Sequence, residues 1–279
     1  MQVQVDLGKF RNRLVLAMSL VKSHAPPSLV WATGDRSLGV YKECPSLSNL
    51  EEKGIEAFPF DAASAESIQA LKEEIVTRTG GKLDLLFNNA GMVYEAPAIE
   101  ADAARIRTIF STNVHGLFNM VSAFTPVLVA SSVQNAVPLV IINTASILAR
   151  IPFPFSAAYN ASKAAPLGIK VVTLFMGEVR TRLMSPEDIC FGSEKSRNHA
   201  ENSMSPEEFA AQIIREILVK SPVYGKGGYL WKGTNAWLIW LLDAMGWRKV
   251  FDGTVKKLVG LDKREIQDSI IGKARAAVG

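Results

Sequence analysis

The stretch Leu83-Asp84-Leu85-Leu86-Phe87-Asn88-Asn89-Ala90-Gly91 joins an apolar run to a turn of small residues. Its apolar half, 83–87, has the length and composition of a strand that is buried on both faces. The small residues at 88–91 let the backbone of the turn approach another group closely. A buried strand that ends in such a turn is typical of a parallel sheet that binds its ligand beyond the carboxyl ends of its strands.

Similar apolar runs recur along the chain and alternate with segments of helical periodicity. This alternation predicts an α/β fold with a doubly wound parallel sheet and helices on both faces. The expected strands cover 29–32, 55–60, 83–87, 137–142 and 169–174. Helices are expected around Ile68, Leu71 and Ile75 up to Gly80-Gly81, over 101–124, and after the capping box Ser205-Pro206-Glu207-Glu208.

A serine, a tyrosine and a lysine follow the apolar strand at 137–142. Ser146 ends the segment 137–146, and Tyr159 lies 13 positions further on (159 − 146). Tyr159 and Lys163 are four positions apart, so on a helix they share one face. We expect the ammonium group to favour the phenolate and to lower the pKa of Tyr159 from its usual value near ~10. With a serine hydroxyl that holds a carbonyl oxygen, the pair is suited to general-acid chemistry.

These motifs, with Asn113 between them, follow one another in an order that closely resembles the short-chain dehydrogenase/reductase family. The resemblance runs from about Val30 to Thr181. It implies a Rossmann-like fold and an oxidoreductase that transfers hydride between a nicotinamide cofactor and a ketone or secondary alcohol. Fold kinship alone does not establish activity, so a catalytically inactive relative that acts as a binding protein remains the alternative.

The resemblance also implies a role for each catalytic residue. Tyr159 would donate the proton to the developing alkoxide, and Ser146 would hydrogen-bond the carbonyl oxygen. Lys163 would depress the pKa of Tyr159 and hold the nicotinamide ribose. Asn113 would keep a helix locally open, so that a water links Lys163 to solvent. The alternatives are an amide on a helix surface for Asn113 and an ordinary loop hydroxyl for Ser146.

The resemblance further implies a cofactor site along the carboxyl ends of the strands. Asp61 would accept a hydrogen bond from the adenine amine, although it also suits the start of the following helix as a negative charge. The turn at 88–91 would approach the adenosine ribose, and Gly177 matches a glycine that relatives carry after the sixth strand. The residues expected to bind the cofactor are Arg36, Asp61, Asn88, Asn89, Ala90, Gly91, Tyr159, Lys163, Val179 and Thr181.

Arg36 decides which nicotinamide cofactor we expect. A cation after the second strand favours the 2′-phosphate of NADP(H), whereas a carboxylate there favours the free hydroxyl of NAD(H). Asp35 and Arg36 are adjacent, so a shift of one position would reverse the choice. The Ala-Thr-x-x-Arg pattern at 32–36 resembles the members that prefer NADP(H), which is the cofactor we expect, with NAD(H) as the alternative.

Two departures from the family pattern concern whole structural units. The window 7–21 contains only Gly8, so the first strand and its glycine-rich phosphate loop are expected to be degenerate or missing. After Lys163, Pro166 and Gly168 lead directly into the next strand, where relatives have several more helical turns. A truncated gene model, a splice form and an inactive relative all fit this pattern.

The composition excludes several other classes of protein. The 279 residues are 48% hydrophobic, which suits one sizeable α/β domain. The net charge of +4 is spread through the chain without a basic block, so nucleic acid is not an expected partner. The three histidines and two cysteines form no cluster, so no metal site is expected. Two cysteines far apart in the sequence also fit an intracellular, reducing compartment. Polar residues interrupt 1–20, so no signal peptide is expected.

We divide the chain into a Rossmann-like domain, 1–228, and a tryptophan-rich extension, 229–279. Within the first, the polar segment 181–204 is expected on the substrate side. In the second, Trp231, Trp237, Trp240 and Trp247 lie close together, ahead of several lysines. Region 229–264 therefore either contacts a membrane interface peripherally or packs over a substrate pocket or a partner.

The tail resembles fungal family members near acyldihydroxyacetone-phosphate reductase, which act on lipid-like ketones. This likeness implies a hydrophobic carbonyl substrate, a part in lipid metabolism, and a cytoplasmic protein at the surface of the endoplasmic reticulum or lipid droplets. An oligomer is also compatible with the family.

Overall fold

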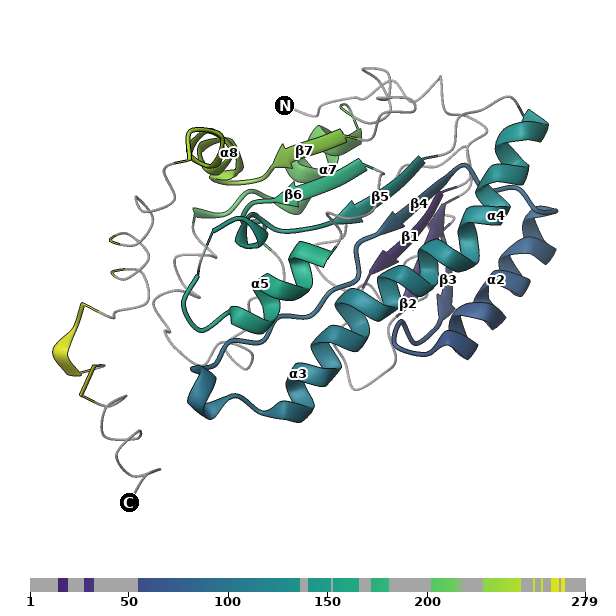
Figure 1. The fold of residues 1–279 in the computed structure, drawn as a ribbon. Coiled ribbons are helices and arrows are strands. Elements are labelled where there is room, and N and C mark those ends of the chain that lie inside the picture. The colour runs from purple at the N-terminus through teal and green to yellow at the C-terminus, as the bar shows by residue number, and fades with distance from the viewer. Residues whose placement is uncertain are drawn as a thin grey trace.

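The computed structural model describes residues 15–19, 28–32, 55–135, 140–151, 153–165, 172–180, 202–214 and 228–246, with isolated positions elsewhere. The described strands are β1 (Val15–Ser19), β2 (Ser28–Ala32), β3 (Ile55–Pro59), β4 (Leu85–Asn88), β5 (Val140–Thr144), β6 (Val172–Met176) and β7 (Gly228–Lys232). They form one sheet in the order β3-β2-β1-β4-β5-β6-β7 (Figure 1). This order supports the α/β, Rossmann-like prediction.

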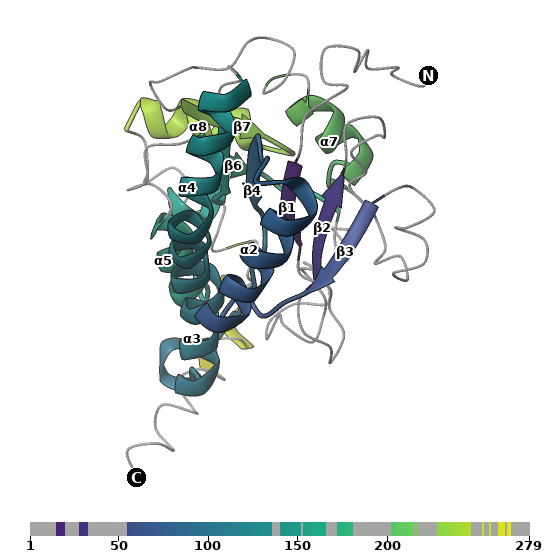
Figure 2. The same ribbon diagram turned by 90° about the vertical axis from the view of Figure 1, so that its right-hand side faces the viewer.

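The described helices cover the two faces of this sheet. They are α2 (Ala65–Thr79), α3 (Ala103–Phe110), α4 (Leu117–Asn135), α5 (Ala157–Ala164), α7 (Pro206–Ile214) and α8 (Ala236–Ala244), and a π-helix, Ser111–Gly116, joins α3 to α4. Figure 2 shows α4 and α5 on one side of the sheet and α7 on the other. The sheet is therefore covered on both faces, as expected.

The amino-terminal strands differ from expectation in two respects. We expected the first strand to be degenerate or missing, but β1 lies inside the sheet, between β2 and β4, and pairs with β4 in parallel. We also expected parallel strands throughout, but β2 runs antiparallel to both β1 and β3. Only eight residues, 20–27, connect β1 to β2, and a parallel crossover needs a dozen or more. None of the eight is a glycine, so no glycine-rich loop follows β1.

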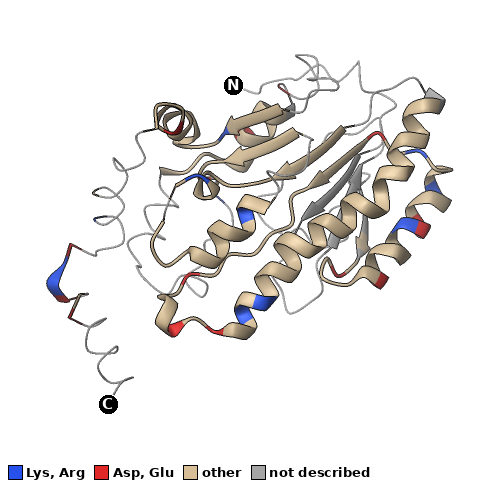
Figure 3. Ribbon diagram, viewed as in Figure 1, with Lys and Arg blue, Asp and Glu red and all other residues tan. Residues whose placement is uncertain are grey.

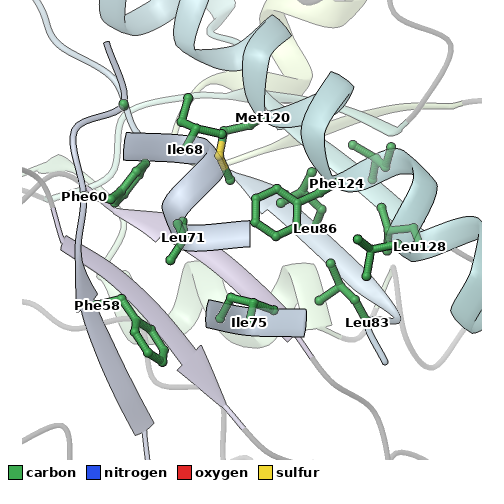
Figure 4. Close-up of a cluster of buried hydrophobic side chains, with 13 residues drawn as sticks. Phe58, Phe60, Ile68, Leu71, Ile75, Leu83, Leu86, Met120, Phe124 and Leu128 are labelled. Atoms are coloured by element: carbon green, nitrogen blue, oxygen red, sulfur yellow. The ribbon is translucent and has the colours of Figure 1, made fainter. Parts of the chain in front are cut away.

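Alternation along the central strands builds two cores. Leu86 and Ile141 face α2 and α4, where they join the cluster drawn in Figure 4. Leu85 and Ile142 point to the opposite face and join Phe209 of α7. Strands buried on both faces explain why the sequence at 83–87 is apolar at nearly every position.

Several local signals in the sequence have the expected structural result. Gly80 ends α2 in a left-handed conformation with φ of 62°, which glycine adopts without strain. The Ser205 hydroxyl caps α7 by accepting a hydrogen bond from the backbone N–H of Glu208 at 3.1 Å. The helical stretch 103–133 is long and apolar enough to cross a membrane by length and composition alone. Its α4 part bears no charged residue (Figure 3); one side of it packs in the core, where Phe124 is fully buried, whereas Phe118, Val129 and Val133 are exposed.

The predicted boundary after residue 228 is corrected by β7. This strand pairs with β6 in parallel, so the start of the predicted extension is the edge of the main sheet. Trp231 of β7 stacks on Phe175 of β6 with ring centroids 4.1 Å apart. The following α8 packs Ala236 and Ile239 against Ile147 of the segment that follows β5. The region 228–246 thus belongs to the same domain as the predicted catalytic residues.

Candidate active site

The predicted catalytic residues converge beyond the carboxyl ends of β4 and β5. Ser146 follows β5 by two residues, and the turn at 88–91 leaves β4. Tyr159 and Lys163 come from α5, and Asn113 comes from the π-helix between α3 and α4. All four side chains are at least nine-tenths buried. The structure therefore assembles in one place residues that the sequence spreads over 50 positions.

Tyr159 lies on α5 with its ring inside a small apolar cluster. The ring is 6% exposed and packs against Val93, Tyr94 and Ile109. Val93 and Tyr94 belong to the segment that leaves β4, and Ile109 belongs to α3. The phenol is thus packed between the segment after β4 and α3, and its hydroxyl interacts with the Ser146 side chain.

Ser146 occupies the point where β5 gives way to a single 3-10 turn. Its side chain accepts a hydrogen bond from the backbone N–H of Leu148 at 3.1 Å, which caps that turn. The same hydroxyl lies close enough to Tyr159 to act on the pKa of the phenol. A carbonyl oxygen placed between the two hydroxyls would receive hydrogen bonds from both.

Lys163 reaches under the turn at 88–91. Its Nζ donates a hydrogen bond to the carbonyl oxygen of Thr144 at 3.1 Å. The hydroxyl of Thr144 donates to Oδ1 of Asn89 at 3.1 Å, which ties the end of β5 to the turn after β4. A Cβ atom at position 91 would lie 2.8 Å from Nζ and 3.5 Å from Oδ1 of Asn113. Glycine at 91 therefore leaves the space that the ammonium group occupies.

Asn113 is a structural link between three segments. Its Oδ1 accepts from the backbone N–H of Met92 at 2.8 Å, and its Nδ2 donates to the Met92 carbonyl at 2.9 Å. Nδ2 also donates to the Ser162 hydroxyl of α5 at 2.9 Å. The helix opens into a π-turn here, as expected, and the side chain is 4% exposed. The alternative of a surface amide is wrong.

The pKa values in this site correct one prediction. Burial raises the pKa of Tyr159 to about 12; the hydrogen bond with Ser146 acts against this, and the charge of Glu95 adds to it. We expected Lys163 to lower the pKa of Tyr159, but the desolvation of the phenolate outweighs every favourable contact. Burial also lowers the pKa of Lys163 to about 8. At neutral pH both groups are therefore mainly protonated, the phenol as a neutral hydroxyl and the lysine as an ammonium.

The predicted cofactor residues fall into three groups. Gly91 of the turn lies beside Lys163 and Asn113, Asn89 is bound to Thr144, and Ala90 packs against the core formed with α2 and α4. Asn88 is buried in the sheet and donates to Asn143 of β5 at 2.8 Å. Arg36 and Thr181 lie outside the described residues.

Asp61 and Val179 occupy structural positions as well. The Asp61 carboxylate accepts from the backbone N–H of Ala63 at 2.8 Å, just before α2. Val179 is buried against α7 and pairs with Met204 across the segment 181–204, of which 202–204 is described. Gly177 lies so close to the carbonyl of Thr234 that a Cβ would be 2.1 Å from its oxygen. No role toward a cofactor follows from these contacts alone.

Two features of the site were missed in the sequence. Glu95 is a buried carboxylate that receives a hydrogen bond from Ser156 at the start of α5. The Arg150 guanidinium donates two hydrogen bonds to one carboxylate oxygen of Asp243, at 2.7 and 2.9 Å, and so ties α8 to the turn after Ser146. Neither pair has a spacing that indicates contact. Within the described part of the chain, no three potential metal ligands lie together.

The comparisons with known proteins agree with this geometry. Residues 16–183 match the family described as short chain dehydrogenase. The short-chain dehydrogenase srdE of Neurospora crassa is 31% identical over 255 residues, which are 82% of this chain and 84% of the relative. The NADPH-dependent 1-acyldihydroxyacetone phosphate reductase of Schizosaccharomyces pombe is 28% identical over 220 residues, 68% of this chain and 72% of the relative.

A solved structure supports the fold in particular. A short chain dehydrogenase from Burkholderia cenocepacia, in complex with NADP, superimposes with a TM-score of 0.52 at 23% identity. The match covers 71% of this chain and 80% of that one. The resemblance inferred from the motifs is confirmed, since the matched family covers more than half of the chain. This protein belongs to the short-chain dehydrogenase family.

Proposed function

We propose that this protein is an NADP(H)-dependent oxidoreductase that interconverts a hydrophobic ketone and its secondary alcohol. The observation that carries the proposal is that Ser146, Tyr159 and Lys163 are buried together: the Ser146 side chain acts on the pKa of the phenol, and Lys163 lies one helical turn away on the same face of α5. Two hydroxyls that meet in a buried site can hold and protonate one carbonyl oxygen.

The residues present fit a nicotinamide cofactor at the turn after β4. The missing Cβ at Gly91 leaves space beside the Lys163 ammonium, and within the described part of the chain that ammonium donates to one acceptor, the Thr144 carbonyl. Lys163 has donors to spare for the hydroxyls of a ribose. When bound, the cofactor supplies the hydride, and the protein supplies position and charge.

The proton is handled by this chain's own residues. Tyr159 is neutral at pH 7, because its pKa is raised to about 12, so it carries a proton that it can donate from its hydroxyl to the oxygen of the reduced carbonyl. Ser146 orients that oxygen through its own hydroxyl. The Lys163 ammonium, four residues along the helix, stabilises the phenolate that remains. Asn113 holds Met92 and Ser162 around this pair.

NADP(H) and a lipid-like substrate are the finer parts of the proposal. Arg36 supports NADP(H) through its charge, and the fission-yeast relative is named as NADPH-dependent with an acyl substrate. NAD(H) remains the alternative cofactor. The alternative function is that of a family member that binds a ligand or partner without catalysis.

Titration of the purified protein with NADPH tests the proposal, with nucleotide fluorescence as the signal and consumption of NADPH with 2-decanone as the assay. We expect saturable binding and turnover. Tyr159→Phe should abolish turnover and leave the affinity for NADPH nearly unchanged. The matched control is Tyr229→Phe, because Tyr229 is an exposed tyrosine on β7. Absence of saturable binding would favour the non-catalytic alternative.

A second proposal concerns membrane contact, and the exposed tryptophans of α8 favour it. Ile239 packs inward, whereas Trp237 and Trp240 are 65% and 50% exposed on the outer side of the helix. Tryptophan favours the interface between lipid and water. The Arg150 partner compensates the charge of Asp243, so the outer face of α8 carries no unpaired acid. We propose a cytoplasmic protein that touches membrane or lipid-droplet surfaces through the region 229–264.

Flotation with phosphatidylcholine–phosphatidylserine vesicles tests this contact. Deleting 229–279 is unsuitable, because it would remove β7 from the sheet. Trp237→Ser with Trp240→Ser should reduce flotation, whereas the control Phe118→Ser, at an exposed position of α4, should not. Equal flotation of both variants and the unmodified protein would refute the membrane proposal.

A further inference from the structure

The buried carboxylate of Glu95 lies beside the N-cap residue of α5, and the reaction described above gives it no role. Glu95 is 3% exposed and follows the turn after β4 by four residues. The hydroxyl of Ser156, which is fully buried, donates a hydrogen bond to Glu95 Oε1 at 2.8 Å. Burying a carboxylate is costly unless its environment compensates it. The hydrogen bond from Ser156 is one contact that compensates this cost.

The backbone beside this contact is held as well. The N–H of Ala96 donates to the carbonyl of Phe155 at 2.8 Å, so two adjacent residues of one segment bind two adjacent residues of the other. Phe155 itself has φ of 64°, a left-handed conformation that is unfavourable for a residue with a Cβ. Such a turn persists only when its surroundings hold it in place. Glu95 and Ala96 provide the contacts that do so.

The turn held in this way carries Tyr159. Ser156 is the residue at which α5 begins, and its carbonyl accepts the first helical hydrogen bond, from the N–H of Asn160 at 2.8 Å. Tyr159 lies three residues after Ser156, within that first turn. Its ring packs on Val93, which belongs to the same segment as Glu95. A shift of the Glu95 segment would therefore move the Tyr159 hydroxyl relative to Ser146.

The charge of Glu95 acts on the same phenol. After burial, which has the larger effect, the negative charge of Glu95 raises the pKa of Tyr159. The other charged or titratable groups around Tyr159 are Lys163 on α5, Tyr94, Asp102 whose backbone N–H donates to the Tyr94 hydroxyl, and Arg105 above the Tyr94 ring. Of these groups, only Glu95 is an acid that is buried together with the phenol.

We propose that Glu95 is a positioning residue of this active site, which holds Ser156 and the first turn of α5 and so places the Tyr159 hydroxyl. This inference rests on the proposed role of Tyr159 as proton donor. It makes Glu95 the residue that couples the segment after β4 to the catalytic helix. It also predicts that reduction of a ketone, which needs the protonated phenol, persists to higher pH than it would without this charge.

Glu95→Gln separates charge from position, because glutamine still offers an acceptor to Ser156. The phenolate absorbance after a rapid pH jump, minus that of Tyr159→Phe, reports the ionisation of Tyr159 without any need for turnover. We expect this ionisation to occur at lower pH in Glu95→Gln and at the same pH in the control Glu100→Gln, an exposed acid of the same segment. An unchanged ionisation in Glu95→Gln would overturn the electrostatic part of the proposal.

Ser156→Ala tests the positional part, even if Glu95→Gln does not fold. Hydrogen exchange of the amides at 160–164, which make the helical hydrogen bonds of α5, should become roughly tenfold faster after the loss of one buried hydrogen bond, while α7 exchanges as before. Equal exchange in α5 would overturn the positional role. Failure of NADPH to bind the unmodified protein would refute the proposed function instead, and would leave both of these readouts valid for Glu95.

Discussion

Gly91 and Lys163 share one small space in the site. A Cβ at position 91 would lie 2.8 Å from the Lys163 Nζ and 3.4 Å from its Cε. The turn after β4 therefore lies close to α5, the helix that carries Tyr159, although the two residues are 72 positions apart in the sequence (163 − 91). The glycine of the Asn-Asn-Ala-Gly turn is thus needed here for space, since its φ does not lie in the left-handed region.

Gly91→Ala should reduce turnover more than stability. The clash falls on the end of a flexible side chain, so Lys163 can move aside at little cost, and its ammonium then leaves its place beside the Thr144 carbonyl. We expect a loss of turnover of roughly tenfold or more, in the range of a lost positioning contact, with nearly unchanged thermal unfolding. Gly253→Ala is the control, because a Cβ there meets open space. A Gly91→Ala protein with normal turnover would contradict the assigned place of Lys163.

The shifted pKa values predict how stability depends on pH. Lys163 has a pKa of about 8 in the folded state, against 10.5 for the free group. Between these two pH values the unfolded chain binds a proton that the folded protein has released. The free energy of unfolding therefore increases as pH rises from about 8 to 10.5. Lys163→Met should remove this rise and stabilise the protein below pH 8 by up to a few kcal/mol. The measurement is urea unfolding at a series of pH values. A rise that persists in the variant would show that Lys163 is not its cause.

Tyr159 has the opposite effect at higher pH. Its folded pKa of about 12 exceeds the free value of 10.0, so the folded state keeps the proton that the unfolded chain releases. Stability therefore falls as pH increases from 10 toward 12. Tyr159→Phe should flatten this fall, whereas Tyr229→Phe, at an exposed site, should leave it unchanged. The comparison is again made by unfolding free energy against pH.

Asn113→Ala tests the link at the π-helix. The substitution removes three hydrogen bonds, two with Met92 and one with Ser162, from a site that is 4% exposed. At about 1 kcal/mol for each bond, we expect a loss of unfolding free energy of about 3 kcal/mol. Ser122→Ala, on the exposed side of the same helix, should change stability by less than about 0.5 kcal/mol. Equal effects would mean that the amide is not a structural link.

The parts of the fold that were predictable are those in which local sequence and tertiary burial agree. The apolar residues of the strand at 83–87 and of the helix with Ile68, Leu71 and Ile75 are spaced as their burial requires. Helix α2 ends at Gly80, the residue from which the sequence predicted its end. The orientation of β2 was not predictable in this way. An apolar run has the same pattern in either direction, and only the short connection at 20–27 decides between them.

The site shows a similar division. The order of Ser146, Tyr159 and Lys163 reports chemistry that family members share, so these residues could be identified without coordinates. Glu95 could not, because a single acid in a mixed segment has no spacing to distinguish it from a solvated one. The direction of the Tyr159 pKa shift was also wrong in prediction. It depends on how completely the phenol is buried, which sequence spacing does not reveal.

Gly177→Ala should disturb the junction between β6 and α8. Gly91→Ala should leave the backbone of its own turn in place. A Cβ at 177 would lie 2.1 Å from the carbonyl oxygen of Thr234, and a backbone atom cannot move aside alone. The backbone N–H of Gly177 also donates to the Lys232 carbonyl at 2.8 Å, so β7 would shift with it. We expect a loss of about 1–3 kcal/mol of unfolding free energy, as for other overpacked sites, together with faster hydrogen exchange in α8. A variant as stable as the unmodified protein, with normal exchange in α8, would show that the contact between Gly177 and Thr234 is not needed to hold that helix.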